Sequence, residues 1–252
     1  MSEQLPAGGI ELSPAEIEAL DARWSSSWTP AEVARRLAGV AAPWYVAAGW
    51  ALDLFRGRQT REHGDIEIAV PAARFPEVRD RFPGYAFDAA GSGRIWANAT
   101  PEVLAGTHQT WLRDPATGHY LVDVFREPHD ADTWICRRDE AIRLPYREII
   151  RHTEDGIPYL APELVLLFKA KAARAKDQAD FDGALPHLTP RQRDTLTGLL
   201  ARVHPGHPWL AALLARSGKQ RSRRPANYVI TARAARIQFS TIGATWGRLG
   251  QP

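Results

Sequence analysis

The chain is poor in cysteine and contains no long apolar run. Cys136 is the only cysteine among 252 residues, which excludes an internal disulfide framework and a zinc cluster built from cysteines. No segment reaches the roughly 20 consecutive apolar residues that a membrane-spanning helix needs, and the N-terminus, with Glu3, Pro6 and Gly8, lacks a secretory pattern. We therefore expect a cytoplasmic protein without a membrane partner.

Internal repeats and low-complexity tracts are also lacking. The composition, 44% hydrophobic and 24% charged, is typical of a globular protein. A chain of this length can bury a substantial core, either as one large domain or as two small ones.

Acidic residues are missing from residues 219–252, which hold seven basic residues, although the whole chain has a net charge of only +3. The rest of the chain is therefore net negative. A basic segment can contact nucleic acid, but solvated basic ends are commoner, so nucleic acid is not the partner we expect. We predict that this tail is poorly ordered and lies outside the chemistry.

Cap signals and hydrophobic periodicity predict an α/β (α+β) fold, with a small mixed β-sheet, flanking helices and a C-terminal helical domain. The predicted strands cover residues 44–46, 66–70, 91–98, 107–113 and 119–125. The predicted helices cover residues 13–22, 50–56 and 75–81, with others beginning at Pro30, Pro162 and Pro190. We divide the chain into an N-terminal helical extension (1–28), a core (29–158), a C-terminal helical domain (159–218) and the basic tail (219–252).

Two acids one residue apart, Asp65 and Glu67, occupy an otherwise apolar strand. Side chains at i and i+2 of a strand project from the same face, and a charge inside an apolar strand is expensive. Both carboxylates therefore point at one site. The alternative is an exposed edge strand with solvated carboxylates.

A third acid, Asp123, interrupts the apolar run of residues 119–125. If this strand lies beside residues 66–70, three carboxylates converge, and they need a counter-charge to stay ionised. Hard divalent cations such as Mg²⁺ prefer oxygen ligands. We predict a site for two Mg²⁺ ions, which would act on a phosphate-containing substrate.

A turn and two lysines are suited to phosphate. Gly49 precedes the helix that begins at Trp50, so backbone N–H groups and a helix N-terminus face an anion there. Lys169 interrupts an apolar stretch, and Lys176, seven residues later, shares its helix face. Lys171 lies between these two lysines in the sequence. The alternative for Lys171 and Lys176 is that they only solvate the helix.

Three further side chains are candidate substrate contacts. His63 borders the acids and either touches substrate, orients a carboxylate or is a surface histidine. Trp96 and Trp111 lie on predicted strands that flank the cleft, whereas most of the other tryptophans are expected to anchor the core.

Together these residues resemble the nucleotidyltransferase superfamily that includes DNA polymerase β, and within it the branch of aminoglycoside 2″-adenylyltransferase-like proteins. The resemblance covers roughly residues 30–215. Four segments carry it, with the sequences WYVAAGWALD (44–53), GRQTREHGDIEI (57–68), YLVD (120–123) and LAPELVLLFKAK (160–171).

The resemblance implies metal-dependent transfer of a nucleoside monophosphate from ATP or another nucleoside triphosphate to a hydroxyl of a small molecule, with an aminoglycoside-type or lincosamide-type antibiotic among the acceptors. Asp65, Glu67 and Asp123 would hold the metals, with Asp123 also a candidate base. Ala48, Gly49, Trp50, Lys169 and Lys176 would bind the nucleotide phosphates.

Two departures from the family pattern accompany the match. Ala48 stands where relatives usually have the first of two adjacent glycines, and its Cβ is tolerated only if this residue adopts a negative φ and the nucleotide does not press on it. Glu67 replaces the commoner aspartate and can still ligate Mg²⁺. Two alternatives stay open: nucleotidylation of a protein or tRNA, as in toxin-like relatives, or a nucleotide-binding protein with degenerate activity.

Overall fold

The computed structural model describes residues 5–221. Residues 222–252, most of the predicted basic tail, lie outside the described residues, and residues 219–221 end helix α10 (Trp209–Arg221). Within the described range, no helix has the length and apolarity to cross a membrane.

In the described part of the chain, nine strands form one mixed sheet, in the order β1-β5-β4-β6-β7-β3-β2-β12-β11. β3 pairs with β7, and β2 with β12, in parallel; the other neighbouring pairs are antiparallel. The predicted mixed α/β fold is thus confirmed. The strands are β1 (Ile10–Glu11), β2 (Tyr45–Val46), β3 (Glu67–Pro71), β4 (Ala86–Gly91), β5 (Arg94–Trp96), β6 (Gln109–Arg113), β7 (Tyr120–Glu127), β11 (Ile150–His152) and β12 (Pro158–Leu160).

A second, smaller sheet has the order β10-β9-β8 and follows β7 directly. Its strands are β8 (His129–Asp130), β9 (Thr133–Ile135) and β10 (Arg143–Pro145). The sequence analysis did not predict this sheet.

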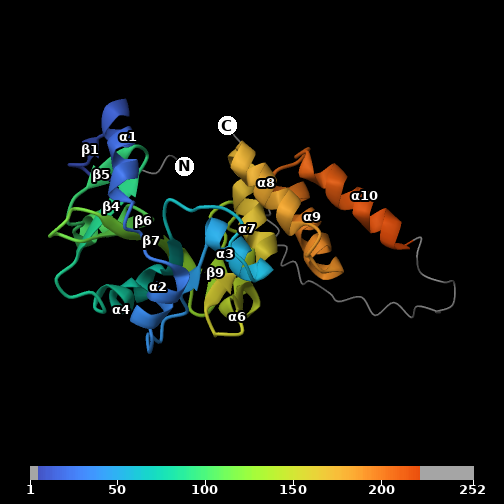
Figure 1. Cartoon of the computed structure of the whole chain (residues 1–252), viewed down its shortest axis with the longest axis horizontal. Coiled ribbons are helices and arrows are strands. Elements are labelled where there is room, and N and C mark those ends of the chain that lie inside the picture. Colours follow the sequence, from blue (N-terminus) through green and yellow to red (C-terminus); the bar gives the residue numbers. More distant parts are fainter. Residues whose placement is uncertain (1–4, 222–252) are drawn as a thin grey trace, which may run out of the picture.

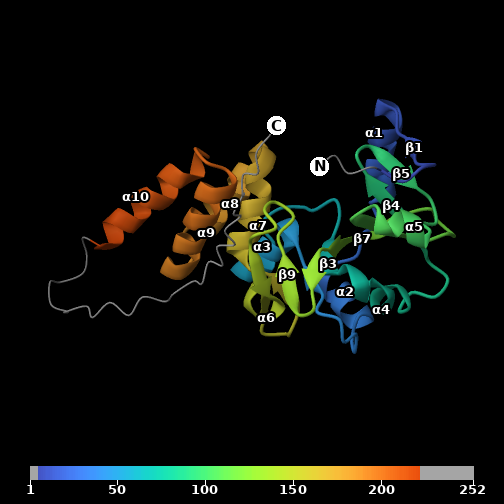
Figure 2. The same ribbon diagram turned by 180° about the vertical axis from the view of Figure 1, so that it is seen from behind.

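The C-terminal helices and part of the large sheet lie at opposite ends of the molecule. One end holds α7, α8, α9 and α10, the other holds β1, β4 and β5, and α3 lies between them (Figures 1 and 2). α7 packs against α3, α8 and α9. The helices are α1 (Pro14–Arg23), α2 (Pro30–Arg36), α3 (Ala48–Arg56), α4 (Phe75–Arg79), α5 (Pro101–Ala105), α6 (Tyr146–Ile149), α7 (Pro162–Lys169), α8 (Ala175–Ala184), α9 (Pro190–Val203) and α10.

The helix starts follow the predicted cap signals. Ser13 and Thr29 each form a capping box with the glutamate three residues later, and proline occupies the first turn of both helices. A capping box satisfies backbone N–H groups that a helix start would otherwise leave unpaired.

Apolar burial fixes the centre of the sheet. In β3, Ile68, Ala69 and Val70 are at most 1% exposed, because helices and loops cover both faces of this parallel strand. Leu164 to Leu167 of α7 are at most 2% exposed and belong to the same core. The sheet and the first C-terminal helix therefore share one apolar core.

The sheet continues across the predicted boundary between the core and the helical domain. β12 spans this boundary, and its Tyr159 pairs with Val46 of β2. β2 is the strand that leads into the turn before α3, so the segment that precedes the C-terminal helices helps to position the site.

Candidate active site

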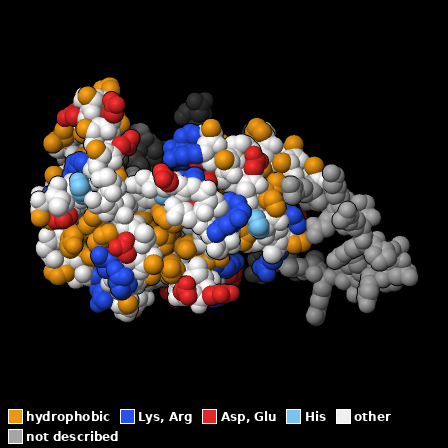
Figure 3. All heavy atoms as spheres, in the orientation of Figure 1, with side chains coloured by type: hydrophobic (Ala, Val, Ile, Leu, Met, Phe, Trp, Pro, Cys, Tyr) orange, Lys and Arg blue, Asp and Glu red, His pale blue; other side chains and the backbone are white. Residues whose placement is uncertain are grey.

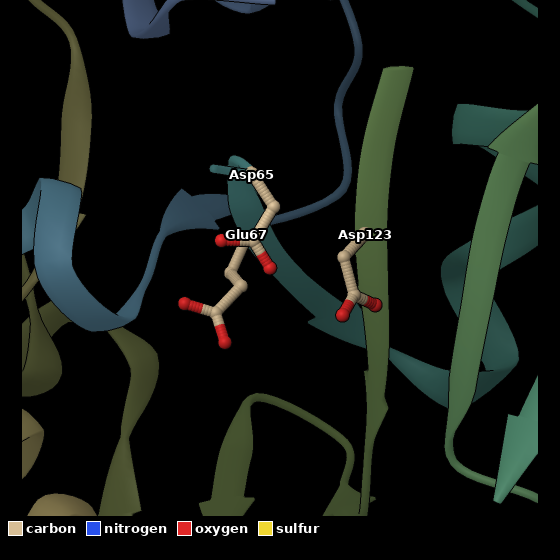
Figure 4. Close-up of side chains that lie close together, drawn as sticks. All are labelled: Asp65, Glu67 and Asp123. Atoms are coloured by element: carbon tan, nitrogen blue, oxygen red, sulfur yellow. The ribbon is translucent and has the colours of Figure 1, made fainter. Parts of the chain in front are cut away.

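Three carboxylates meet where β3 and β7 lie side by side. Asp65 immediately precedes β3, Glu67 begins it, and the parallel register places Glu67 opposite Asp123 of β7. One oxygen from each carboxylate lies within 4.8 Å of the others. Figure 4 shows Asp65 and Glu67 on one segment of chain and Asp123 on the neighbouring strand. The structure thus brings the three predicted acids together.

Crowding and burial change the acidity of this cluster. Burial, followed by the charge of Asp65, raises the pKa of Glu67 to about 7, against the opposing effect of Lys169. Burial and the charge of Glu67 hold the pKa of Asp123 well above its usual range. Without a cation, the cluster therefore tends to retain protons near neutral pH.

The two carboxylate oxygens of Asp123 differ in their hydrogen bonds. Asp123 is only 2% exposed, and Gln109 Nε2 donates a hydrogen bond to its Oδ2. Oδ1 is buried and makes no hydrogen bond of regular geometry among residues 5–221, although the indole N–H of Trp111, opposite Asp123 in the sheet, acts on this carboxyl and lowers its pKa. Three carboxylates that meet in this way are a donor set that fits a hard divalent cation. Asp65, Glu67 and Asp123 are therefore the residues that could hold Mg²⁺.

The turn between β2 and α3 has an unusual backbone. Ala48 has a φ of +47°, in the left-handed region that a Cβ disfavours. The condition of a negative φ at this residue is therefore not met. The Ala47 N–H donates to the Glu67 carbonyl over 2.7 Å, which ties the turn to β3.

Gly49 is required by close packing of the protein's own side chains. A Cβ at this position would lie 2.3 Å from Arg61 Nη2 and 2.7 Å from His63 Cε1, closer than any real contact. The sequence analysis attributed this glycine to the approach of an anion. In the structure, Arg61 and His63 cover its Cα, and all three residues line the same cavity.

His63 is buried and is paired with an acid outside the predicted set. Its Nε2 lies 2.6 Å from Asp53 Oδ2, with both side chains 4% exposed, and Thr60 Oγ1 donates to the other Asp53 oxygen over 2.5 Å. Trp50 stacks on the imidazole with ring centroids 4.3 Å apart. Burial lowers the pKa of His63, against the hydrogen bond to Asp53. The alternative that His63 is a surface histidine is therefore wrong. The sequence signal that could have found Asp53 is an acid on an otherwise apolar helix.

Lys169 is held by two aspartates of α8. Its Nζ lies 2.8 Å from Asp177 Oδ1 and 2.9 Å from Asp180 Oδ2, and its side chain is 9% exposed. Asp180 also accepts a hydrogen bond from Arg61 Nε over 3.2 Å. Burial alone would raise the pKa of Asp177, but hydrogen bonds from Arg174 and Lys169 outweigh it and lower that pKa. This ion-pair network joins α7 and α8 to the loop before β3.

A cavity of about 630 Å³ opens beside the acids. Its lining includes Asp65, Glu67, Ala48 and Lys169. Exposed basic side chains of α8 and of the segment before this helix add positive charge. On the face in Figure 3, Lys and Arg side chains gather between the sheet and the C-terminal helices. The basic residues that line this cavity are Arg61, Arg137, Arg138, Lys169, Lys171, Arg174 and Lys176.

The two candidate tryptophans do not line this cavity. Trp96 is 5% exposed, and its Nε1 donates to the Ala7 carbonyl over 3.0 Å. Trp111 packs edge-on against Trp24 and Tyr120, with ring centroids 5.5 and 5.0 Å apart. Trp96 therefore packs at the sheet, whereas the indole of Trp111 also acts on Asp123 of the acid cluster, whose pKa it lowers.

Comparison with known proteins adds a family. The model of the aminoglycoside-2″-adenylyltransferase family matches residues 31–96, which include the turn at Ala48, Asp65 and Glu67. No curated protein matches the chain.

Several solved structures are similar at low identity. The lincosamide antibiotic adenylyltransferase LnuA, solved with lincomycin bound, is 17% identical, with 70% of this chain and 98% of that chain covered and a TM-score of 0.42. The antibiotic-resistance factor ANT(2″)-Ia is 14% identical, with coverages of 83% and 97% and a TM-score of 0.42. A nucleotidyltransferase-like protein from Paracoccidioides brasiliensis is 18% identical, with coverages of 82% and 95% and a TM-score of 0.41. At such scores we draw nothing further from these likenesses.

The family match includes the strained turn and two of the three converging acids. The predicted resemblance to antibiotic adenylyltransferases is thus confirmed for the segment 31–96.

Proposed function

We propose that this protein transfers AMP, or another nucleoside monophosphate, from a nucleoside triphosphate to a hydroxyl of a small molecule in a Mg²⁺-dependent reaction. The observation that carries the proposal is the meeting of three carboxylate oxygens within 4.8 Å, one of them buried and without a hydrogen bond of regular geometry in the described chain. Seven basic side chains line the adjacent cavity, and positive charge suits a triphosphate.

Asp65, Glu67 and Asp123 would hold one or two Mg²⁺ ions, which polarise the phosphoryl oxygens and acidify the attacking hydroxyl when bound. The hydroxyl oxygen forms a bond to the α-phosphorus, and the bond from that phosphorus to the bridging oxygen breaks. Pyrophosphate leaves with the electron pair. Asp123 Oδ1, which makes no hydrogen bond of regular geometry in the described chain and belongs to a carboxyl whose pKa is raised by burial, would accept the hydroxyl proton.

The chain's other groups would position the triphosphate. Ala48 and Gly49 form the first turn of α3, so the N–H groups of this helix N-terminus favour a phosphate there. Lys171 and Lys176 are exposed at the cavity and form no ion pair within residues 5–221, which leaves them able to neutralise phosphate charge. Lys169 would act mainly by holding α8 in place, since both its partners are carboxylates.

The description of the matched family suggests an antibiotic as the hydroxylated acceptor. Nucleotidylation of a protein or tRNA lacks a specific supporting feature among the described residues. The degenerate alternative rested on Ala48, and the left-handed backbone of this alanine leaves it as an outcome of the experiment that follows.

Pyrophosphate release with Mg²⁺, each nucleoside triphosphate and candidate acceptors tests the proposal. Asp65→Asn should reduce release to background and leave the fold intact or more stable, because it removes a charge that raises the pKa of Glu67. Glu62→Gln, an exposed acid in the same loop, is the matched control and should retain activity. Activity in Asp65→Asn would refute the metal assignment, and nucleotide binding without release for any acceptor would establish the degenerate alternative.

A further inference from the structure

Two adjacent arginines reach the cavity from the loop between β9 and β10. Arg137 Nη2 lies 3.4 Å from Glu127 Oε1, and the Arg137 side chain is 26% exposed. Its guanidinium lies 4.8 Å from the centre of the Phe125 ring. The Arg138 guanidinium lies 5.3 Å from the centre of the Phe168 ring. All five residues line the cavity that borders the acid cluster.

These arginines have unused donors. The Nε atoms of Arg137 and Arg138 are both buried and have no hydrogen-bond partner among the described residues. Glu127 is already engaged, because Trp134 Nε1 donates to its Oε2 over 3.0 Å and Arg137 pairs with Oε1. Arg138 forms no ion pair in the described chain. The buried Nε atoms are closed to a ligand, so the donors that could bind one are the terminal Nη groups of Arg138, which line the cavity and pair with no carboxylate in the described chain.

The arginine pair lies on the β7 side of the acid cluster. Side chains alternate along a strand, so Phe125 and Glu127 share a face of β7 with Asp123, each step of two residues adding about 7 Å. The turn at Ala48 and the exposed lysines, which we assign to the triphosphate, belong to α3 and to the segment from α7 to α8. Phe168, whose ring lies near both guanidinium groups, is also part of α7. The arginine pair is therefore a second basic region on the β7 side of the same cavity, and it meets the first region at α7.

Charge decides what this second region can bind. Seven basic and four acidic side chains line the cavity, but Asp123 of the acid cluster and Asp180, which pairs with Arg61 and Lys169, leave little net charge over the whole site. At the arginine pair the balance is positive, because Glu127 pairs with Arg137 and Arg138 forms no ion pair among the described residues. A nucleoside triphosphate bound with two Mg²⁺ ions is close to neutral overall, so under the proposed function it does not change this local balance. A polycationic acceptor would meet like charge in a confined space, which disfavours it. An acceptor with an acidic group would meet two guanidinium forks, whose planar geometry suits phosphate and carboxylate.

We propose that Arg137 and Arg138, with Phe125 and Phe168, form an acceptor subsite for an anionic group, a phosphate or a carboxylate. The substrate is then an acidic hydroxylated molecule rather than a polycationic aminoglycoside. The aromatic rings would pack against the body of the acceptor while they hold the two guanidinium groups in place. This proposal rests on the proposed nucleotidyl transfer.

Titration with inorganic phosphate, followed by calorimetry, tests the subsite in the full chain. The nucleotide site is first filled with a non-hydrolysable triphosphate analogue and Mg²⁺, so that phosphate reports only on the second region. We expect Arg138→Gln to weaken phosphate binding at least tenfold, since it removes a charged donor. Arg143→Gln, on an exposed arginine of the same hairpin, should leave it unchanged. Arg138→Lys keeps the charge without the fork and should lie between wild type and Arg138→Gln.

Three results would overturn the proposal: no phosphate binding to the wild type, equal binding by wild type and Arg138→Gln, or tighter binding of the polycation tobramycin than of phosphate. A thermal midpoint for each variant close to that of the wild type establishes that the fold is retained. Arg138→Lys serves as the readout if Arg138→Gln does not fold.

Failure of the proposed function would be visible separately. If the triphosphate analogue does not bind to the wild type, nucleotidyl transfer is wrong. The phosphate titration is then repeated on the nucleotide-free protein, with Lys176→Gln as a probe of the other basic region. Sensitivity to Arg138→Gln but not to Lys176→Gln would still establish the anion subsite, and the reverse pattern would refute it. With transfer established, Arg138→Gln should raise KM for an acidic acceptor without changing KM for the nucleotide.

Discussion

The left-handed backbone at Ala48 gives a quantitative prediction: Ala48→Gly should stabilise the protein. A left-handed conformation costs a residue with a Cβ about 1–2 kcal/mol, and glycine avoids that cost. Glycine also makes the unfolded chain more flexible, which offsets about 0.4–1 kcal/mol of the gain. With φ at +47°, we expect a net increase in the free energy of unfolding of about 0.5–1 kcal/mol, or a rise in Tm of about 1–4 °C for a chain of this size.

Two other alanines, one with a positive φ and one with an extended backbone, provide controls. Ala131, in the exposed turn between β8 and β9, has a φ of +45°, so Ala131→Gly should give a similar gain without touching the cavity. Ala47 has a φ of −115° and should respond in the opposite way, since glycine there only adds flexibility and costs about 0.5–1 kcal/mol.

Urea denaturation with an unchanged m-value, together with Tm, measures these effects. The reasoning would be refuted if Ala48→Gly destabilised the protein while Ala131→Gly stabilised it, because the two residues share the same backbone strain. KM for the nucleoside triphosphate should not rise in Ala48→Gly, since the substitution removes only a methyl group that lines the cavity.

Two further predictions concern the cation and the packing of the turn. Because burial and the charge of Asp65 raise the pKa of Glu67 to about 7, protons compete with Mg²⁺ for this carboxylate. Calorimetry should therefore show that the Mg²⁺ affinity increases from pH 6 to pH 8, by up to about tenfold per pH unit below that pKa. A flat profile would show that Glu67 is already ionised. Gly49→Ala should destabilise the fold by about 1–3 kcal/mol, because its Cβ would lie 2.7 Å from Cε1 of His63, a ring that Asp53 and Trp50 hold in place. Gly198→Ala, in α9 with open space around it, should instead stabilise the fold by about 0.5–1 kcal/mol, and equal effects of the two substitutions would contradict the packing argument.

The sequence predicted the parts of the fold that local patterns determine. Capping boxes marked the starts of α1 and α2, and apolar alternation marked β3, β6 and β7. β4 escaped prediction because Asp88 interrupts it and its alanines and glycine have low strand propensity. In the structure, Asp88 is 2% exposed and pairs with Arg113 Nε over 2.7 Å, while the Tyr120 hydroxyl donates to it over 3.2 Å. These partners come from other strands, so no local pattern reveals them.

The candidate site shows the same division. Asp65, Glu67 and Asp123 stand out because acids are rare in apolar strands, and the parallel pairing of β3 with β7 then brings them together. The partners of Lys169 lie on the next helix, and their pairing depends on how α7 packs against α8. Arg137 and Arg138 occupy a loop without periodicity, so only the three-dimensional structure shows that they reach the cavity.

The return of the chain to β2 through β12 has a consequence for dividing this protein into parts. A fragment that ended before Tyr159 would expose the edge of β2, the strand that leads into the turn at Ala48. Replacing the C-terminal helices with those of another protein would require a junction inside a hydrogen-bonded ladder. Changes of acceptor are therefore easier to obtain by altering residues 136–142, the loop between β9 and β10, which carries the two arginines and belongs to neither edge of the large sheet.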